Sequence, residues 1–125
     1  MKILVDTNVL IYSAKTGFDL FSELKNFGAS KILIPTEVIS ELEQLVESAN
    51  KGSDKKSAKL AIQIINYSKI TFVNLGSGHT DDAIISYSKT NKNLVITNDS
   101  ELKKRLTANK IGVLSLSRNK KIITS

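Results

Sequence analysis

Acidic side chains follow two strand-like stretches of this sequence, at positions where a carboxylate can take part in chemistry. Asp6 comes directly after the apolar stretch KILV, and Asp99 follows LVIT with only Asn98 between them. A carboxylate at the end of an apolar strand can cap a helix, form half of an ion pair, or bind a cation. The rest of the sequence helps to decide among these roles.

Three further acids are expected near the same place. Glu41 lies one turn into a helical pattern after KILIP, and Asp81 and Asp82 open the pattern TDDAIISYSK. Helices that follow parallel strands begin at the carboxyl ends of those strands, so these acids should start close to Asp6 and Asp99. Carboxylates a few ångströms apart repel one another, and a divalent cation removes that repulsion. Because the candidate ligands are all oxygens, they favour Mg²⁺ or Mn²⁺ over Zn²⁺.

Each acid taken alone has a simpler interpretation. Asp6 is a sound N-cap for a helix over TNVLIYSA, and Asp99 can cap the pattern that follows it. Glu41 alone would be a solvated helix acid, and Glu101 either supplements the site or faces water. The combination of acids favours a shared metal site, at which a metal would orient a water and neutralise charge on a phosphodiester. Solvated helix acids are expected at Glu37, Glu43 and Glu47.

Strand-like and helical patterns alternate along the chain. Strands are predicted at residues 2–5, 31–34, 70–73, 93–97 and 112–116, and helices after Asp6 and over residues 35–49, 53–68, 80–89 and 99–106. Pro35 suits the start of a helix, Ser53 and Thr80 suit N-caps, and NKGSDKK is the best loop candidate. This alternation predicts an α/β protein, a three-layer α/β/α arrangement around a mainly parallel sheet, with residues 1–125 as one domain.

Composition excludes several classes of protein. The 125 residues contain no cysteine, so there is neither a disulfide framework nor a thiolate metal site. Asp6 and Asn8 interrupt the first apolar stretch too early for a signal peptide, and no stretch reaches the roughly 18 apolar residues of a membrane span. We therefore expect a cytoplasmic protein without a membrane partner.

The net charge of +6 is concentrated at the end of the sequence. Residues 1–100 hold equal numbers of acidic and basic residues, so the whole excess lies after residue 100. Such a cluster either binds a polyanion or keeps the protein in solution. The final stretch SRNKKIITS either binds a phosphate backbone or forms an edge strand. The candidate contacts with a polyanion are Lys103, Lys104, Arg105, Arg118, Lys120 and Lys121.

Four motifs together resemble one known family. ILVDTNVLI, SELEQL, TDDAII and LVITNDSEL occur in the order and approximate spacing of the PIN-domain ribonucleases. The end of the sequence is most similar to the branch related to the endonuclease that processes small-subunit ribosomal RNA precursors, and the toxin–antitoxin branch is the next most similar. The resemblance implies a Mg²⁺- or Mn²⁺-dependent endoribonuclease, whose metal-activated water attacks phosphorus and leaves 5′-phosphate and 3′-hydroxyl ends.

The resemblance also implies roles for individual residues. Asp6, Glu41 and Asp99 match the first, second and fourth metal-binding acids of the family. The third is Asp81 or Asp82, and Asp81 is favoured because it shares a helical stripe with apolar residues. Groups that orient the carboxylates or bind water are expected at Thr7, Asn8, Thr97 and Asn98.

RNA is the partner that the resemblance implies. A homodimer is expected as well, together with an antitoxin or a ribosome-assembly partner. His79 either contacts substrate phosphate or is an ordinary loop residue.

Other functions fit the sequence less well. A dehalogenase-type phosphatase needs a second acid two residues after Asp6, where this chain has Asn8. A receiver domain needs an acid after its middle strand, and ITFVNLGS provides none. The remaining rival is a catalytically inactive PIN domain that serves only as an RNA-binding or scaffolding module in ribosome biogenesis. Converging acids argue against it, because without a metal they would repel phosphate.

Overall fold

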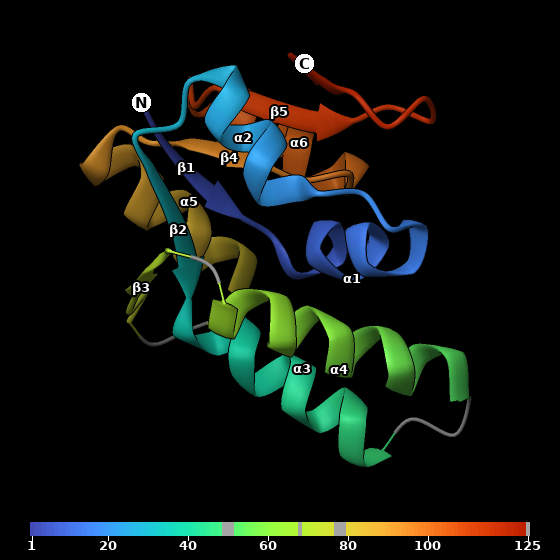
Figure 1. The fold of residues 1–125 in the computed structure, drawn as a ribbon. Helices are drawn as coiled ribbons and strands as arrows, with labels where there is room; N and C mark the ends of the chain where they lie inside the picture. The colour runs from blue at the N-terminus through green and yellow to red at the C-terminus, as the bar shows by residue number, and fades with distance from the viewer. Residues whose placement is uncertain (49–51, 68, 77–79, 125) are drawn as a thin grey trace.

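Short apolar stretches form a central sheet in a computed structural model that describes residues 1–48, 52–67, 69–76 and 80–124. In this part of the chain six strands lie in the order β3-β2-β1-β4-β5-β6 (Figure 1). All neighbours pair in parallel except β5 and β6, which are antiparallel. The expected mainly parallel sheet is therefore confirmed. The strands are β1 (Lys2–Val5), β2 (Lys31–Pro35), β3 (Thr71–Val73), β4 (Leu94–Ile96), β5 (Val113–Leu116) and β6 (Ile122–Thr124).

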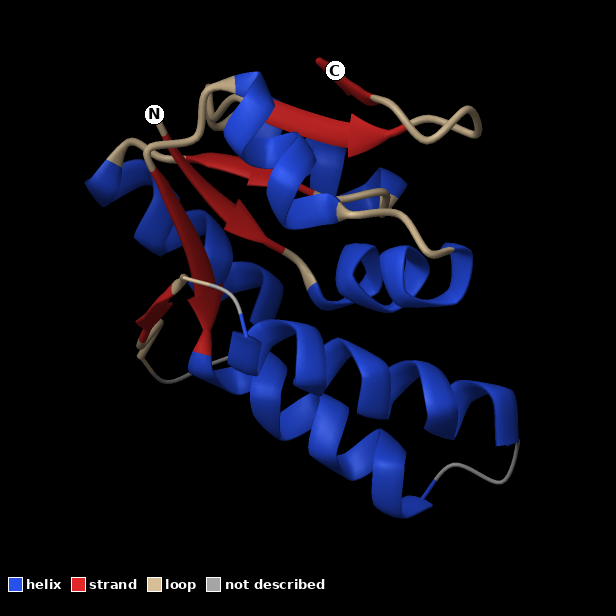
Figure 2. Cartoon of the chain, viewed as in Figure 1, coloured by secondary structure: helices blue, strands red, loops and turns tan. Residues whose placement is uncertain are grey.

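Helices cover both faces of the sheet, which gives the expected three layers (Figure 2). Alternate side chains of β1 enter different cores: Ile3 and Val5 pack against α1 to α4, and Leu4 packs on the side of α5 and α6. None of the helices in the described ranges is long and apolar enough to cross a membrane. The helices are α1 (Thr7–Thr16), α2 (Leu20–Phe27), α3 (Thr36–Ser48), α4 (Gly52–Tyr67), α5 (Thr80–Asn91) and α6 (Ser100–Ala108).

Helix α2 was not predicted from the sequence, although its ends carry recognisable signals. Asp19 caps the helix, since its carboxylate accepts hydrogen bonds from the backbone N–H and the hydroxyl of Ser22. Gly28 ends it at a positive φ of 122°, and its N–H bonds the carbonyl of Leu24. Leu20, Phe21 and Leu24 are buried on one side. A capping acid, an apolar stripe and a terminal glycine are typical helix signals.

Several predicted boundaries were wrong. Pro35 ends β2 instead of starting a helix, in register with Val73 of β3. Helix α4 begins at Gly52, so most of the predicted loop NKGSDKK is helical where it is described, and Ser53 lies inside the helix. Thr80, predicted as an N-cap, is instead the first residue of helix α5. The residue before it lies outside the described residues. The final stretch contributes the edge strand β6.

The pairing of β1 with β4 decides where the acids gather. Val5 is in register with Ile96, and the backbone N–H of Asp6 donates to the carbonyl of Ile96 at 3.1 Å. The residues that follow these two strands therefore meet at the same end of the sheet. We call this end, where the five parallel strands finish, the acidic edge, and the opposite end, where they begin, the amino edge.

Candidate active site

Asp6 is a buried carboxylate at the acidic edge. It follows β1, its side chain is only 8% exposed, and it caps α1. Its Oδ1 accepts a hydrogen bond from the Thr7 backbone N–H at 2.8 Å, and its Oδ2 accepts one from the Thr97 hydroxyl at 2.8 Å. Two fixed donors hold the carboxylate in one orientation. The capping role expected for Asp6 taken alone is thus present, and it leaves the carboxylate at the end of the strand.

Thr97 connects the two strand-end acids. It is fully buried at the end of β4, and its backbone N–H bonds the carbonyl of Leu114 in β5. Its hydroxyl donates to Asp6 and also accepts from the Asp99 backbone N–H at 3.1 Å. The Asp99 Oδ1 in turn caps α6 by accepting from the Leu102 N–H at 3.0 Å. One hydroxyl therefore fixes Asp6 relative to the backbone that carries Asp99.

Two acids from other elements act on Asp6. Burial raises the pKa of Asp6 above its ordinary value, its bonds to Thr97 and Thr7 oppose this rise, and the carboxylates of Asp81 and Glu41 add to it. Asp81 lies in the first turn of α5 and Glu41 lies in α3, and both are half-buried. Acids from three separate parts of the chain therefore lie close enough to interact electrostatically.

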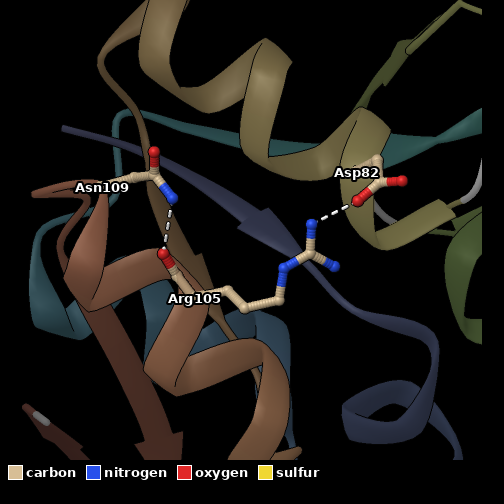
Figure 3. Close-up of polar contacts among 3 residues, drawn as sticks. All are labelled: Asp82, Arg105 and Asn109. Carbon is tan, nitrogen blue, oxygen red and sulfur yellow. Dashed lines mark hydrogen bonds and ion pairs between the residues drawn. The ribbon is translucent and has the colours of Figure 1, made fainter.

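Asp82 forms an ion pair with Arg105, in contrast to the electrostatic effect of Asp81 on Asp6. Its Oδ1 forms an ion pair with the Arg105 guanidinium of α6, and Figure 3 shows this contact bridging the two helices. The carbonyl of Arg105 also accepts a bond from the Asn109 side-chain amide. The side chains of Arg105 and Asp82 are 45% and 62% exposed, so the pair is a surface contact. Asp82 also raises the pKa of Arg105.

The other polar residues predicted for the site have varied surroundings. Both side-chain polar atoms of Asn98 bond the backbone of Leu116 in β5, at 3.2 Å to its carbonyl and 2.8 Å from its N–H. The Thr7 hydroxyl is buried without a hydrogen-bond partner, and Asn8 is exposed in the first turn of α1. His79 lies outside the described residues.

Half of the predicted RNA-binding residues are engaged within the protein. Arg105 pairs with Asp82, Lys104 pairs with Glu101 at 3.9 Å, and the Lys120 ammonium donates to the Thr16 carbonyl at 3.0 Å. Glu101 is exposed and faces water with Lys104. The remaining three are half-buried Lys103 and exposed Arg118 and Lys121.

Glu37 differs from the solvated acid expected at its position. It is half-buried in the first turn of α3, and its Oε2 is buried without a hydrogen-bond partner. An unpaired buried carboxylate oxygen is costly. Glu43 and Glu47 are exposed, as expected. The sequence signal that could have indicated burial of Glu37 is its spacing of four residues from Glu41, which puts the two acids on the same face of α3.

The donor set at the acidic edge fits a hard divalent cation. Asp6 is buried with like charges from Asp81 and Glu41, so a cation would relieve both the repulsion and the cost of burial. In the described part of the chain no three acids stand close enough to enclose an ion by themselves. Mg²⁺ is commonly bound by one or two carboxylates and several waters, so a complete cage is not required.

Comparison with known proteins identifies the class to which this fold belongs. The PIN-like domain family matches residues 3–120, which is nearly the whole chain. The chain is 36% identical over 124 residues to ribonuclease VapC4 of Methanocaldococcus jannaschii, covering 95% of this chain and 92% of the relative. It is 31% identical over 118 residues to ribonuclease VapC9 of Archaeoglobus fulgidus, covering 94% and 84%. The chain therefore belongs to the PIN-like domain family.

Solved structures share this fold. The PIN domain endonuclease Utp24 superposes with a TM-score of 0.81 at 25% identity, over 99% of this chain and 90% of that chain. VapBC2 from Rickettsia felis, bound to a DNA fragment from its promoter, gives a TM-score of 0.66 at 18% identity, over 92% and 98%. The first is similar in sequence as well as in fold, and the second in fold alone.

Proposed function

We propose that this protein is a Mg²⁺- or Mn²⁺-dependent endoribonuclease that hydrolyses phosphodiester bonds of RNA. The observation that carries the proposal is the buried Asp6 carboxylate, which has two like charges from α3 and α5 beside it. Such a group is unfavourable in the folded protein unless a cation accompanies it. The similarity to ribonucleases VapC4 and VapC9 and to the endonuclease Utp24 supports the same reaction class.

Each residue at the acidic edge has a defined task in this proposal. Asp6 would bind the metal directly, and Glu41, Asp81 and Asp99, the N-cap of α6, would bind it directly or through waters. A bound metal supplies an activated water and neutralises charge that develops on the phosphate. The Thr97 hydroxyl and the Thr7 N–H orient the Asp6 carboxylate, as hydrogen-bonded partners of metal ligands commonly do.

Asp81, and not Asp82, is the ligand in this proposal. Asp81 acts electrostatically on Asp6, whereas a carboxylate oxygen of Asp82 is engaged by Arg105 on the surface between α5 and α6. Asp82 would therefore set the position of the first turn of α5, which carries Asp81.

Cleavage of a labelled RNA tests the proposal. Incubation with Mn²⁺ or Mg²⁺ should give products with 5′-phosphate ends, and EDTA should abolish them. Asp6→Asn and Asp81→Asn should each lower the rate by more than the roughly 10- to 100-fold that loss of an outer partner costs. Asp82→Asn is the matched control, with the same chemical change one residue away, and should stay within a few-fold of wild type. Cleavage that persists equally in Asp6→Asn would refute the assignment.

A second candidate is the ribonuclease toxin of a toxin–antitoxin pair. The VapC names of the curated relatives favour it. An open groove of about 450 Å³ between α1 and α4 also favours it, since Leu60 is 42% exposed there beside Ala14. An apolar segment of an antitoxin would cover this side chain.

Expression of the protein in a bacterial host separates the two candidates. A toxin should arrest growth, and co-expression of a small protein encoded beside it should restore growth. Leu60→Glu should prevent that rescue while RNA cleavage by the purified variant remains. Normal growth with an active enzyme would favour a processing nuclease.

A further inference from the structure

A row of lysines lies along the amino edge, opposite the acids. Lys2 and Lys31 are the first residues of β1 and β2, and Lys69 lies two residues before β3. Lys92 lies two residues before β4, and Lys110 lies three residues before β5. Every parallel strand of the described sheet therefore begins at or just after a lysine. Figure 1 shows the starts of β1, β2, β4 and β5 gathered on the side that also carries the N-terminus.

Two cavities at this edge are lined by four of these five lysines, all except Lys2, and by two more. A cavity of about 380 Å³ is lined by Lys89, Lys92 and Lys110, and one of about 170 Å³ by Lys25, Lys31 and Lys69. No acidic residue lines either cavity in the parts of the chain that are described. Uncompensated cations around a concave surface attract an anion.

The wall of the larger cavity contains a buried, hydrogen-bonded asparagine and a closely packed glycine. Asn93 is 3% exposed, and its amide donates at 3.0 Å to both the Ser88 hydroxyl and the Leu94 carbonyl. Gly112 lines the same cavity, and a Cβ there would stand 2.4 Å from Leu94 Cδ2. The cavity wall between Lys92 and Lys110 is therefore closely packed.

Two of these lysines occupy backbone conformations that side chains seldom adopt. Lys92 has a φ of 55° and follows α5, and Lys110 has a φ of 60° and follows α6. Glycine or asparagine usually takes this position at a helix end, and another residue costs roughly 1–2 kcal/mol there. The helix dipole does not explain a lysine at position 92, because Lys89 already places a cation in the last turn of α5. Both of these lysines line the same cavity, and a third lysine with a positive φ, Lys120 at 58°, lies away from it, two residues before β6.

We propose that the amino edge binds the phosphodiester backbone of RNA outside the bond that is cleaved. This inference rests on the proposed ribonuclease function. Without a metal the acidic edge repels phosphate, so metal-independent affinity for RNA has to come from another surface. Three of the six C-terminal residues predicted to bind RNA already contact other groups of the protein, whereas the amino-edge lysines form no ion pair with any described residue. A strand held at the amino edge would extend toward the acids at the other end of the sheet.

The test compares two variants of equal charge. The first replaces Lys89, Lys92 and Lys110 with Gln, and the control replaces the exposed Lys55, Lys56 and Lys59 of α4 with Gln. Binding of a fluorescent oligouridylate is followed by anisotropy in EDTA over a range of salt concentrations. Each contacted phosphate contributes about 0.7 to the salt slope of single-strand binding, so the first variant should lower that slope by about 2. The control should leave the slope unchanged.

An unchanged slope in the first variant, or an equal loss in both, would overturn the inference. Circular dichroism checks folding, and Lys31→Gln with Lys69→Gln provides a second variant at the smaller cavity without altering a strained residue. It should lower the slope by about 1.4, by the same relation. Cleavage of a dinucleotide with Mn²⁺ is measured in parallel, because its single phosphodiester bond cannot lie at both edges at once. Lysine-dependent binding without any cleavage would refute the ribonuclease proposal alone, and cleavage without lysine-dependent binding would refute only this inference.

Discussion

At the scale of single residues, the surroundings of Asp6 hold its carboxylate in one orientation at a cost to the stability of the folded protein. A buried carboxylate with two like charges acting on it is unfavourable, yet its two hydrogen bonds hold it in one orientation at the acidic edge. Strain of this kind is typical of functional sites, where the side chain is held in place for a ligand.

The first prediction concerns the pH dependence of the metal-free protein. Because the folded-state pKa of Asp6 is raised above its unfolded value, the folded state holds this proton more tightly. The contribution of Asp6 to stability is therefore favourable at low pH and is lost as the pH rises through the folded pKa. Asp6→Asn should remove this dependence, so that the variant gains most relative to wild type at neutral pH. Urea unfolding in EDTA across the acid range measures it, and parallel curves for the two proteins would contradict it.

The second prediction concerns Thr97. Thr97→Val removes the donor to Asp6 and leaves the partly buried Asp99 N–H without its acceptor, so the free energy of unfolding should fall by about 1–3 kcal/mol. The pKa of Asp6 should rise further, because its bond from Thr97 lowers it. The acidic limb of the pH–rate profile for cleavage should therefore move to higher pH.

Thr97→Ser is the matched control, since it keeps the hydroxyl, and it should retain most of the activity and the original acidic limb. A Thr97→Val profile identical to wild type would show that Thr97 serves only packing.

At the scale of elements, the residues after a strand can support the neighbouring strand instead of the site. Asn98 immediately follows Thr97, but its amide bonds the backbone of Leu116 at the end of β5. This side chain extends the β4–β5 pairing by one residue and holds the start of α6 against the sheet. Adjacent residues of one loop therefore have different tasks.

The third prediction separates these tasks. Asn98→Ala should lower the free energy of unfolding by about 1–3 kcal/mol, because two partially buried backbone groups of Leu116 lose their partners. Below the unfolding transition, cleavage should fall much less than in Thr97→Val. Thermal melts and initial rates measured on the same preparations check it. A larger loss of rate than of stability would assign Asn98 to the site.

At the scale of the whole molecule, charge is separated along the strands. The sheet begins among lysines and ends among acids. Helices α5 and α6 show the same separation, because each runs from an acidic first turn to a basic last turn. Such a molecule would hold RNA at one end of the sheet and require a cation at the other.

The fourth prediction follows from this separation. Mn²⁺ should stabilise the folded protein, because it binds the assembled acids and not the unfolded chain. At one hundred times its dissociation constant the gain should be about 2.7 kcal/mol. Differential scanning fluorimetry with increasing Mn²⁺ measures the shift in Tm, which Asp6→Asn should abolish and Lys55→Gln should not affect. An equal shift in Asp6→Asn would place the ion elsewhere.

The sequence alone determined the alternation of strands and helices, the parallel sheet and the placement of Asp6 and Asp99 at the same end of that sheet. These features follow from local apolar patterns and from the rule that parallel strands finish at one edge, so they need no knowledge of individual contacts. Helix α2 carried comparable local signals, and the sequence would have allowed its prediction.

Only the tertiary structure decided which charges face one another. Asp81 and Asp82 are adjacent in the sequence, yet one acts on Asp6 and the other pairs with Arg105. A count along the chain puts the positive excess after residue 100, whereas the fold lines up lysines from five separate strand starts. The physical reason is that electrostatic neighbours are set by strand pairing between distant segments, which residue order does not reveal.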